Sequence, residues 1–242
     1  MDQYGRTDRL ELADQTLREW EALVLDASAD GIVLDRSAFY PGGGGQPPDH
    51  GVLLWGGVQT RIDGVRKGGD LYLIPREGDP LPPSGTAVRG AVEDSRRTAL
   101  MRTHSALHLL GGVVFRDYGA LVTGGNMEPL EARMDFNLPE VPAGFKEHLA
   151  EACEKEVGAD RAIKVENLPR EQAFAIPDII RTATNLLPPD IEIVRIVDIV
   201  GLDTQADGGT HVRSTRQIGG IEITKVENKG KGFRRVRIRL SD

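Results

Sequence analysis

Short apolar runs separated by turn-forming residues fill the first ninety residues of the chain. In 21–35, EALVLDASADGIVLD, two apolar runs flank SADG, and 51–65 and 69–75 continue the pattern between glycine, proline and aspartate. Apolar runs of this length bounded by turn residues predict β-strands. A small closed barrel is the simplest arrangement for so many short strands. We therefore expect residues 1–90 to form a β-barrel domain.

The pattern becomes helical near residue 90. Leu100, Leu107, Leu110 and Val114 recur at helical spacing, after Asp94 or Ser95 as a cap. A second amphipathic helix is predicted over 144–158, with Phe145, Leu149 and Cys153 or Ala152 inward, a strand over 191–200, and a hairpin over 219–240 whose turn is rich in glycine and lysine. Residues 91–242 are therefore expected to form a second domain of the α+β class with an antiparallel sheet.

Composition narrows the class of protein. The chain has 242 residues, of which 39% are hydrophobic, and this supports a sizeable core. A formal net charge of −7 argues against a general polycation, so any contact with nucleic acid is expected to be local. Cys153 is the one cysteine, which suits a reducing compartment. With no secretory signal and no long apolar run in the sequence, we expect a cytoplasmic protein that does not bind a membrane.

Two histidines in the first predicted helix are candidate metal ligands. His104 and His108 lie four residues apart in MRTHSALHLL, so a helix places both imidazoles on one face, close enough to hold one ion. A zinc peptidase has glutamate directly after the first histidine of such a pair, whereas Ser105 stands there in this chain. Two histidines at this spacing also occur by coincidence on the surface or in the core of a protein, so the pair alone does not establish a metal site. Gly111 and Gly112 follow the pair after two leucines, and two glycines in a helix indicate either close approach of another group or tight packing.

A second pair supplies the missing ligands. Asp207 and His211 are also four residues apart, in QADGGTHVRST, and the glycines between them allow the loop to curl until both side chains converge. Three imidazole nitrogens and one carboxylate oxygen form a set that zinc accepts. Four protein ligands would close the shell of a structural zinc, whereas Asp207 standing off the metal and orienting a water would leave the site open.

These two segments together resemble a known family. RTHSALHLL with DGGTHV closely resembles the His-x-x-x-His and Cys-x-x-x-His zinc motifs of alanyl-tRNA synthetase editing domains and of their free-standing relatives, the AlaX trans-editing proteins. FYPGGGGQPPDHG at 39–51 resembles the glycine-rich motif of the longer AlaX forms, and GALVTGGNMEPLEARMDF and the C-terminal hairpin also resemble their counterparts. The resemblance departs at two positions. Asp207 stands where the family has cysteine, and Leu107 stands where synthetase editing domains commonly have threonine.

The resemblance implies both a fold and an activity. The fold is a barrel like that of translation factors joined to the α+β editing domain shared with threonyl-tRNA synthetase. The activity is zinc-dependent, ATP-independent hydrolysis, in trans, of the ester bond of mischarged tRNA(Ala), most simply Ser-tRNA(Ala) and alternatively the glycyl ester. The resemblance also implies that the glycine-rich loop reaches over the active site and helps to select the amino acid, with Gln46 as its polar residue, and that Thr123, Gly124 and Gly125 line the pocket.

Serine must be distinguished from alanine by its hydroxyl, because the smaller alanine cannot be excluded by size. The candidate groups for this contact are Thr103, Ser105, Thr123, Gln46 and the zinc ion, with Gln46 and Thr123 ranked first. The sequence does not identify a general base.

A basic segment closes the chain. Residues 213–242 hold nine Lys/Arg and three acidic residues, and Arg235, Arg237 and Arg239 alternate with apolar residues in the last predicted strand. Strand periodicity places the three arginines on one face, where they can contact tRNA phosphates or simply be solvated. The sequence thus predicts an aminoacyl-tRNA deacylase with tRNA(Ala) as its partner and no obligate protein partner. The alternative is a non-catalytic RNA-binding protein with a structural zinc.

Overall fold

The computed structural model describes residues 5–28, 30–185 and 187–241. These form two compact units. One takes in the described residues of Met1–Gly43 together with Pro47–Thr98, and the other takes in Gly44–Gln46 together with the described residues of Ala99–Asp242. The division after residue 90 proposed from the sequence remains our proposal for the domain boundary. No helix in the described ranges is both long and apolar enough to cross a membrane.

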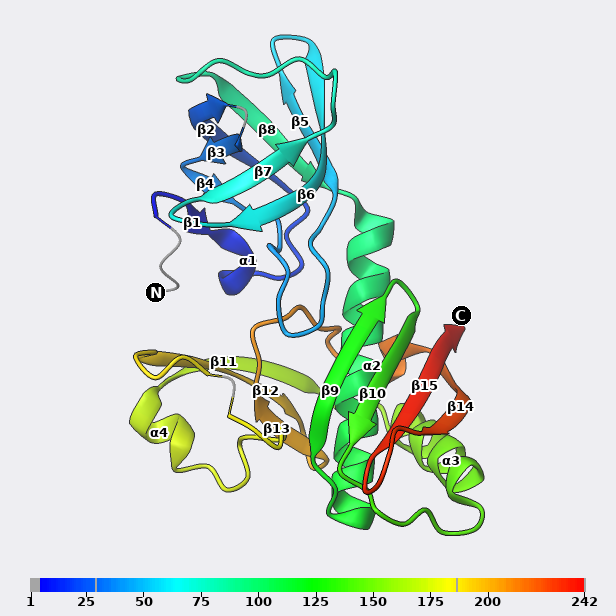
Figure 1. Cartoon of the computed structure of the whole chain (residues 1–242). Coiled ribbons are helices and arrows are strands. Elements are labelled where there is room, and N and C mark those ends of the chain that lie inside the picture. The colour runs from blue at the N-terminus through cyan, green and yellow to red at the C-terminus, as the bar shows by residue number, and fades with distance from the viewer. Residues whose placement is uncertain (1–4, 29, 186, 242) are drawn as a thin grey trace. The chain divides into compact units, whose positions relative to one another are not determined.

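The first unit is a closed six-stranded barrel, as the run of short strands predicted (Figure 1). Its strands follow one another around the barrel in the order β2 (Glu19–Ser28), β3 (Gly31–Leu34), β7 (Leu71–Pro75), β6 (Val58–Lys67), β5 (Gly51–Trp55) and β8 (Ala87–Val92). Alternating burial along β2 and β6 sends every second side chain into a core that includes Trp20, Val24, Leu53 and Ile62. Outside the barrel, β1 (Asp8–Arg9) pairs with β4 (Arg36–Ser37), and a short helix α1 spans Leu10–Ala13.

A buried ion pair fixes the two ends of the glycine-rich loop within this unit. The backbone N–H of Tyr40 donates to Asp49 Oδ2 at 2.7 Å, and the N–H of Asp49 donates back to the Tyr40 carbonyl at 3.1 Å. The guanidinium of Arg97, which is fully buried, donates to the Asp49 carboxylate and to the Ala38 carbonyl. Both ends of the loop are therefore held by groups that have no access to water.

The second unit is α+β with antiparallel sheets, also as predicted. One sheet has the order β14 (Gly220–Asn228), β15 (Arg234–Ser241), β10 (Glu131–Phe136) and β9 (Val122–Glu128). A second sheet has the order β11 (Ile163–Pro169), β12 (Ile193–Ile199) and β13 (Asp203–Ala206). The helices are α2 (Asp94–Tyr118), α3 (Phe145–Gly158), α4 (Arg170–Phe174) and a 3-10 helix at Thr215–Ile218.

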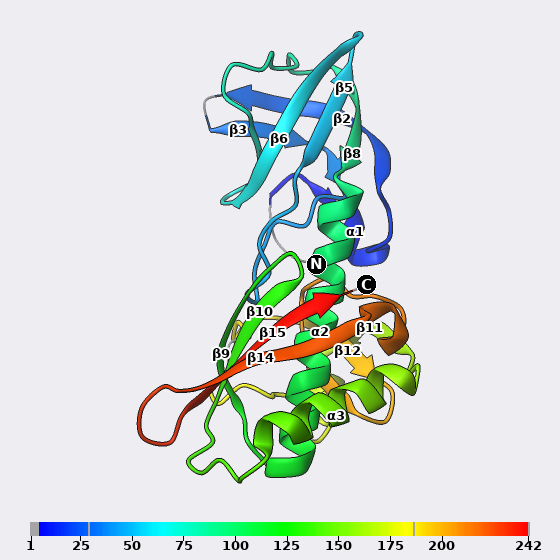
Figure 2. The ribbon, with the colours of Figure 1, turned by 90° about the vertical axis from the view of Figure 1, so that its right-hand side faces the viewer.

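Helix α2 supplies the centre of the second core. Its apolar residues pack in one cluster with residues of both sheets and of α3, among them Leu110, Phe136, Leu149, Val197 and Val236. The four-stranded sheet covers α2 and α3 (Figure 2). Phe145, Leu149, Ala152 and Cys153 are all buried, as the helical pattern predicted. Because α2 is buried around much of its circumference, polar residues on it must find protein partners.

Candidate metal centre

Three imidazoles and one carboxylate converge within the second unit. His104 and His108 lie one turn apart on α2, while Asp207 and His211 lie in the loop that follows β13. One ligand atom from each lies within 4.8 Å of the others, and the rings of the three histidines are 4.5 to 5.1 Å apart between centroids. The structure thus brings together the four residues that the sequence singled out as zinc ligands.

The inner nitrogens of the three rings face the same carboxylate. The Nε2 atoms of His104 and His108 lie 3.5 and 3.9 Å from Asp207 Oδ1, and His211 Nε2 lies 3.0 Å from Asp207 Oδ2. Asp207 Oδ2 also accepts the backbone N–H of Gly209 at 2.6 Å. One carboxylate oxygen is therefore held by the loop, and the other faces the two helical histidines.

Each outer nitrogen meets a polar side chain. His104 Nδ1 lies 2.9 Å from Gln46 Oε1, His211 Nδ1 lies 3.3 Å from Ser105 Oγ, and His108 Nδ1 lies 3.6 Å from a carboxylate oxygen of Asp203. Histidines that ligate metals are usually held in this way, by a hydrogen bond on the nitrogen that does not bind the ion.

The Gln46 contact determines where the His104 proton lies. Gln46 Oε1 accepts the backbone N–H of Thr210 at 3.0 Å, and Gln46 Nε2 donates to Thr210 Oγ1 at 2.9 Å. Since the amide orientation is fixed by a backbone donor, the oxygen facing His104 can only accept. The His104 proton therefore lies on Nδ1, and the lone pair of Nε2 points into the cluster.

Of the two glycines before Thr210, Gly209 is the one that the packing of the loop requires. A Cβ atom at Gly209 would lie 2.2 Å from the His104 ring and 2.9 Å from Gln46 Oε1, whereas one at Gly208 would meet nothing within 4 Å. The backbone at Gly209 thus passes directly against the His104–Gln46 contact, and a side chain there would separate the two.

Burial and neighbouring charge set the protonation of the cluster. Burial lowers the pKa of His104 to about 4, and burial with the charges of its neighbours holds the pKa of His211 well below its usual range. Burial also opposes protonation of His108, but contact with the carboxylates of Asp203 and Asp207 outweighs it and raises its pKa to about 9. Burial would raise the pKa of Asp207, yet the surrounding imidazoles hold it well below its usual value. The carboxylate is ionised near neutral pH, as metal ligation requires.

A cavity of about 950 Å³ opens over the cluster. His104, His108 and Asp207 line it, whereas His211 is fully buried behind them. Its walls are formed by Gly44 and Gly45 of the glycine-rich loop, by the start of β9 and by the segment 180–187, of which residue 186 is not described. Gly44 and Gly45 have φ of +59° and +86°, a backbone region that favours glycine. The space is several times larger than a seryl or alanyl group needs.

The predicted pocket residues differ in their positions. Thr123, Gly124 and Gly125 line the cavity. Gln46 lies beside His104 and is not among the described residues that line the cavity. Thr103 is fully buried, and its hydroxyl donates to the Ala99 carbonyl and accepts the backbone N–H of Leu130 at 2.9 Å.

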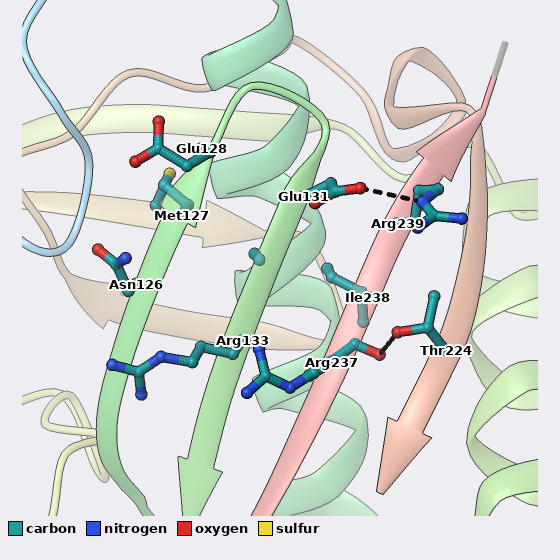
Figure 3. A pocket seen from close by; sticks show the side chains of 10 residues that line it. Asn126, Met127, Glu128, Glu131, Arg133, Thr224, Arg237, Ile238 and Arg239 are labelled. Carbon is teal, nitrogen blue, oxygen red and sulfur yellow. Dashed lines mark hydrogen bonds and ion pairs between the residues drawn. The ribbon is translucent and has the colours of Figure 1, made fainter.

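The three arginines of β15 share an outer face, as the alternation predicted. Arg235 is held by Asp135 through two hydrogen bonds of 2.7 Å and is largely covered. Arg237 and Arg239 are more exposed and pair with Glu227 and Glu131. Arg237 and Arg239, together with Arg133 from β10, line a pocket of about 290 Å³. Figure 3 shows these three side chains across the outer face of β10 and β15. The basic segment therefore meets acidic residues from neighbouring strands.

Asp203 is the residue of this site that sequence reasoning missed. It is buried at the first position of β13 and contacts both His108 and the guanidinium of Arg181. It precedes Asp207 by four residues, but Asp207 lies in the loop after β13, so strand periodicity does not relate the two side chains. The available signal was Gly112, because a Cβ atom on that glycine would lie only 2.8 Å from Asp203 Cβ.

Comparison with known proteins relates the chain to a domain of aminoacyl-tRNA synthetases. The sequence profile of the threonyl and alanyl tRNA synthetase second additional domain matches residues 194–237, a range that contains Asp207, His211, Arg235 and Arg237. The alanine--tRNA ligase of Pyrobaculum neutrophilum is 35% identical over 94% of this chain, which corresponds to 26% of that ligase. The fold is thus the editing domain that alanyl-tRNA synthetase also carries.

Free-standing relatives match over nearly their whole length. The alanyl-tRNA editing protein AlaX-M of Saccharolobus solfataricus is 40% identical over 95% of this chain and 97% of that protein. The AlaX-M protein of Methanosarcina acetivorans is 33% identical over 98% of this chain and 100% of that protein. The chain therefore belongs to the AlaX-M family of alanyl-tRNA editing proteins, which confirms the resemblance seen in its motifs.

Proposed function

We propose that this protein is an aminoacyl-tRNA deacylase that hydrolyses the ester bond of mischarged tRNA(Ala), with Ser-tRNA(Ala) as its substrate and zinc as its metal. The single observation that carries the proposal is the His/Asp cluster, three of whose members line a cavity large enough for an aminoacyl ester and part of its nucleotide. Family membership supports the editing of alanyl-tRNA, and the cluster supports the metal.

The donor set fits zinc. His104, His108 and His211 would hold it through Nε2, and Asp207 Oδ1 faces the same point as fourth ligand or as the partner of a bound water. Nitrogen and carboxylate oxygen ligands from buried, hydrogen-bonded residues are typical of zinc sites. Zinc bound there would supply Lewis acidity toward the ester carbonyl or lower the pKa of a water.

The surrounding residues would orient the ligands, leave room for the substrate and shield a water from bulk solvent. Gln46 and Ser105 orient the rings of His104 and His211 from behind, so their inner nitrogens need no reorganisation. The loop glycines Gly44 and Gly45 let the backbone approach the substrate without side chains in the way. The side chain of Asp207 is only 12% exposed, so a water at Oδ1 would be largely shielded from bulk solvent.

A non-catalytic RNA-binding protein with a structural zinc is the second candidate. Four closed protein ligands would favour it. The position of His104, His108 and Asp207 at the surface of the cavity favours the deacylase, because a purely structural ion needs no such access.

For the selection of serine, Thr123 is the better placed of the two first-ranked residues. Thr123 lines the cavity, whereas the Gln46 amide is engaged by His104 and Thr210. We propose that a hydroxyl-reading contact at Thr123 contributes to discrimination, since a polar group left unpaired by alanine disfavours that substrate. Gly124 lines the wall of the proposed pocket, and Thr103 acts on it indirectly, by holding the β9–β10 turn.

We also propose that the arginines of β15 contact tRNA phosphates. Cross-strand register supports this surface, because Arg133, Arg237 and Lys225 lie directly opposite one another on β10, β15 and β14. Like charges in register destabilise a sheet, and a bound phosphate would relieve that repulsion. Arg237 and Arg239 would make the contacts, and Arg235 would support them through its pairing with Asp135.

The decisive experiment is release of the amino acid from charged tRNA(Ala) by purified, zinc-loaded protein. Seryl, glycyl and alanyl esters are compared at equal enzyme concentration. We expect rapid hydrolysis of Ser-tRNA(Ala) and at least about 100-fold slower hydrolysis of Ala-tRNA(Ala), since a hydroxyl-reading site discriminates strongly. Hydrolysis of both within a few-fold would contradict hydroxyl reading, and hydrolysis of neither would favour the RNA-binding alternative.

A further inference from the structure

Asp203 is buried on the Nδ1 side of His108, and the proposed reaction assigns it no role. One of its carboxylate oxygens accepts from Arg181 Nε at 2.9 Å. The other accepts from Gln205 Nε2 at 2.5 Å and lies 3.6 Å from His108 Nδ1. A carboxylate with almost no access to water is retained only where charged or polar partners hold it.

His108 is the histidine whose outer nitrogen still lacks a hydrogen bond. Among the described residues, its Nδ1 is buried without a partner within hydrogen-bond length, whereas the outer nitrogens of His104 and His211 face Gln46 and Ser105. Once Nε2 holds a metal, the ring proton must lie on Nδ1. The carboxylate beside it is that of Asp203, at 3.6 Å a few tenths of an ångström beyond hydrogen-bond length.

Asp203 can lie this close to α2 because the helix has a glycine, Gly112, at the point of contact. A Cβ atom at Gly112 would lie 2.8 Å from Asp203 Cβ and 3.1 Å from Leu202 Cγ, so any residue but glycine would push the start of β13 away. At the neighbouring Gly111 a Cβ atom would meet only ordinary contacts, at 3.7 Å and beyond. Of the two glycines that follow His108, Gly112 is therefore the one that seats Asp203.

Arg181 joins Asp203 to the wall of the cavity. Its guanidinium stacks on Phe115 of α2 at 4.0 Å from the ring centroid and donates to the Asp178 carbonyl at 2.6 Å. Its own carbonyl accepts the backbone N–H of Val122, and Ala183 N–H donates back to Val122. The wall segment and the first residue of β9 are thus tied to the carboxylate that faces His108.

We propose that Asp203 is a positioning residue for the metal site. Its carboxylate receives the Nδ1–H of His108, so that Nε2 points at the ion, and its pairing with Arg181 connects that ligand to the cavity wall. This inference rests on the proposed metal-dependent function and extends it to a residue outside the ligand set. Asp203 does not touch the substrate.

The test compares Asp203→Asn with Asp198→Asn as a matched control. Asp198 lies opposite Thr204 on the same sheet and accepts its hydroxyl at 2.7 Å, so the control makes the same chemical change away from the cluster. Zinc affinity is measured by chelator competition, and the geometry at the ion is read from the visible absorption of Co²⁺-loaded protein. We expect about a 10- to 100-fold loss of zinc affinity and a shifted Co²⁺ spectrum for Asp203→Asn, and less than about a twofold change for the control.

A second pair of variants tests the contact between Asp203 and His108 without removing a charge. Gly112→Ala should displace Asp203 and change the Co²⁺ spectrum in the same direction, while Gly111→Ala should leave it as in the wild type. If Arg181 acts through Asp203, Arg181→Gln should add little to the loss caused by Asp203→Asn, because the two residues form one unit.

The outcomes separate this inference from the proposed function. Stoichiometric zinc in the wild type with unchanged affinity and spectrum in both Asp203→Asn and Gly112→Ala would overturn the role of Asp203 alone. A wild-type protein that binds no zinc would overturn both proposals. If Asp203→Asn does not fold, the Gly112→Ala and Gly111→Ala pair decides the question.

Discussion

The cluster around Asp207 and the outer face of β15 both gather charged side chains, but they do so under opposite conditions. In the cluster every ring is buried, and each inner nitrogen faces a single carboxylate. On the sheet face Arg237 and Arg239 remain about half exposed, each paired with one carboxylate of a neighbouring strand. Burial makes each contact of the cluster indispensable, whereas solvent screens those of the face. Substitutions should therefore act sharply in the first region and gradually in the second.

Removal of two ligands should have the largest effect. We expect His104→Ala with His108→Ala to lose zinc and to hydrolyse Ser-tRNA(Ala) at least about 100-fold more slowly, because two of the proposed nitrogen ligands are gone. Elemental analysis gives the metal content, and His148→Ala is the control, since His148 pairs with Asp117 at the surface. Full zinc stoichiometry in the double variant would place the metal elsewhere.

The next largest effect is expected from one methyl group added at Gly209. Gly209→Ala would place a carbon 2.2 Å from the His104 ring, and the buried residues Thr210 and His211 that follow it leave little room to yield. We expect about a 10- to 100-fold loss of zinc affinity, measured by chelator competition. Gly208→Ala meets nothing within 4 Å and should bind zinc within about twofold of the wild type. Equal affinities for the two variants would contradict the packing against His104.

On the sheet face, Arg237→Gln with Arg239→Gln should weaken binding of tRNA(Ala) by about 3- to 10-fold. The slope of log Kd against log salt should fall by about 0.7–0.9 for each phosphate that the variant no longer neutralises. Fluorescence anisotropy across a salt series measures both, and hydrolysis of a short aminoacyl ester mimic should stay unchanged. An unaltered salt slope would assign these arginines to a solvated face.

The smallest effect concerns a titration on the same face. Hydrogen bonds from Arg237 and Lys225 lower the pKa of Glu227 to about 2. Because the folded-state pKa lies below the unfolded one, the stability that this pair contributes is present above the ordinary glutamate range and is lost as pH falls toward 2. In Arg237→Gln the pKa of Glu227 should rise toward its ordinary value. NMR titration of the Glu227 carboxyl group measures this directly, and a pKa still near 2 would mean that Lys225 alone holds it.

Local patterns were enough to predict much of this molecule. The two helices, the barrel strands and the alternation in β15 follow from periodicity, and the two i, i+4 pairs of the cluster follow from chain geometry. The β9–β10 hairpin gave no such signal. Its turn places Leu130 at φ +65°, where glycine or asparagine is usual, and the buried Thr103 hydroxyl accepts the Leu130 N–H.

The roles of Gln46 and Asp203 also escaped local reasoning. Both contact their histidines from segments far away in the sequence, and a linear pattern holds no record of which nitrogen of a ring will need an acceptor. Charge counting along residues 213–242 was incomplete for a similar reason, because the carboxylates opposite Arg235 and Arg239 come from β10. Such pairings are fixed by tertiary register.

The distance in sequence between the two halves of the cluster has a consequence for how the protein is made. Ser105 and His211, which touch in the folded chain, are 106 residues apart. Chains emerge from the ribosome in order, so His104 and His108 leave it long before Asp207 and His211 are synthesised. The nascent protein cannot assemble its site until residue 211 is free to fold back onto α2, and a truncated product would carry the helical histidine pair without the other two.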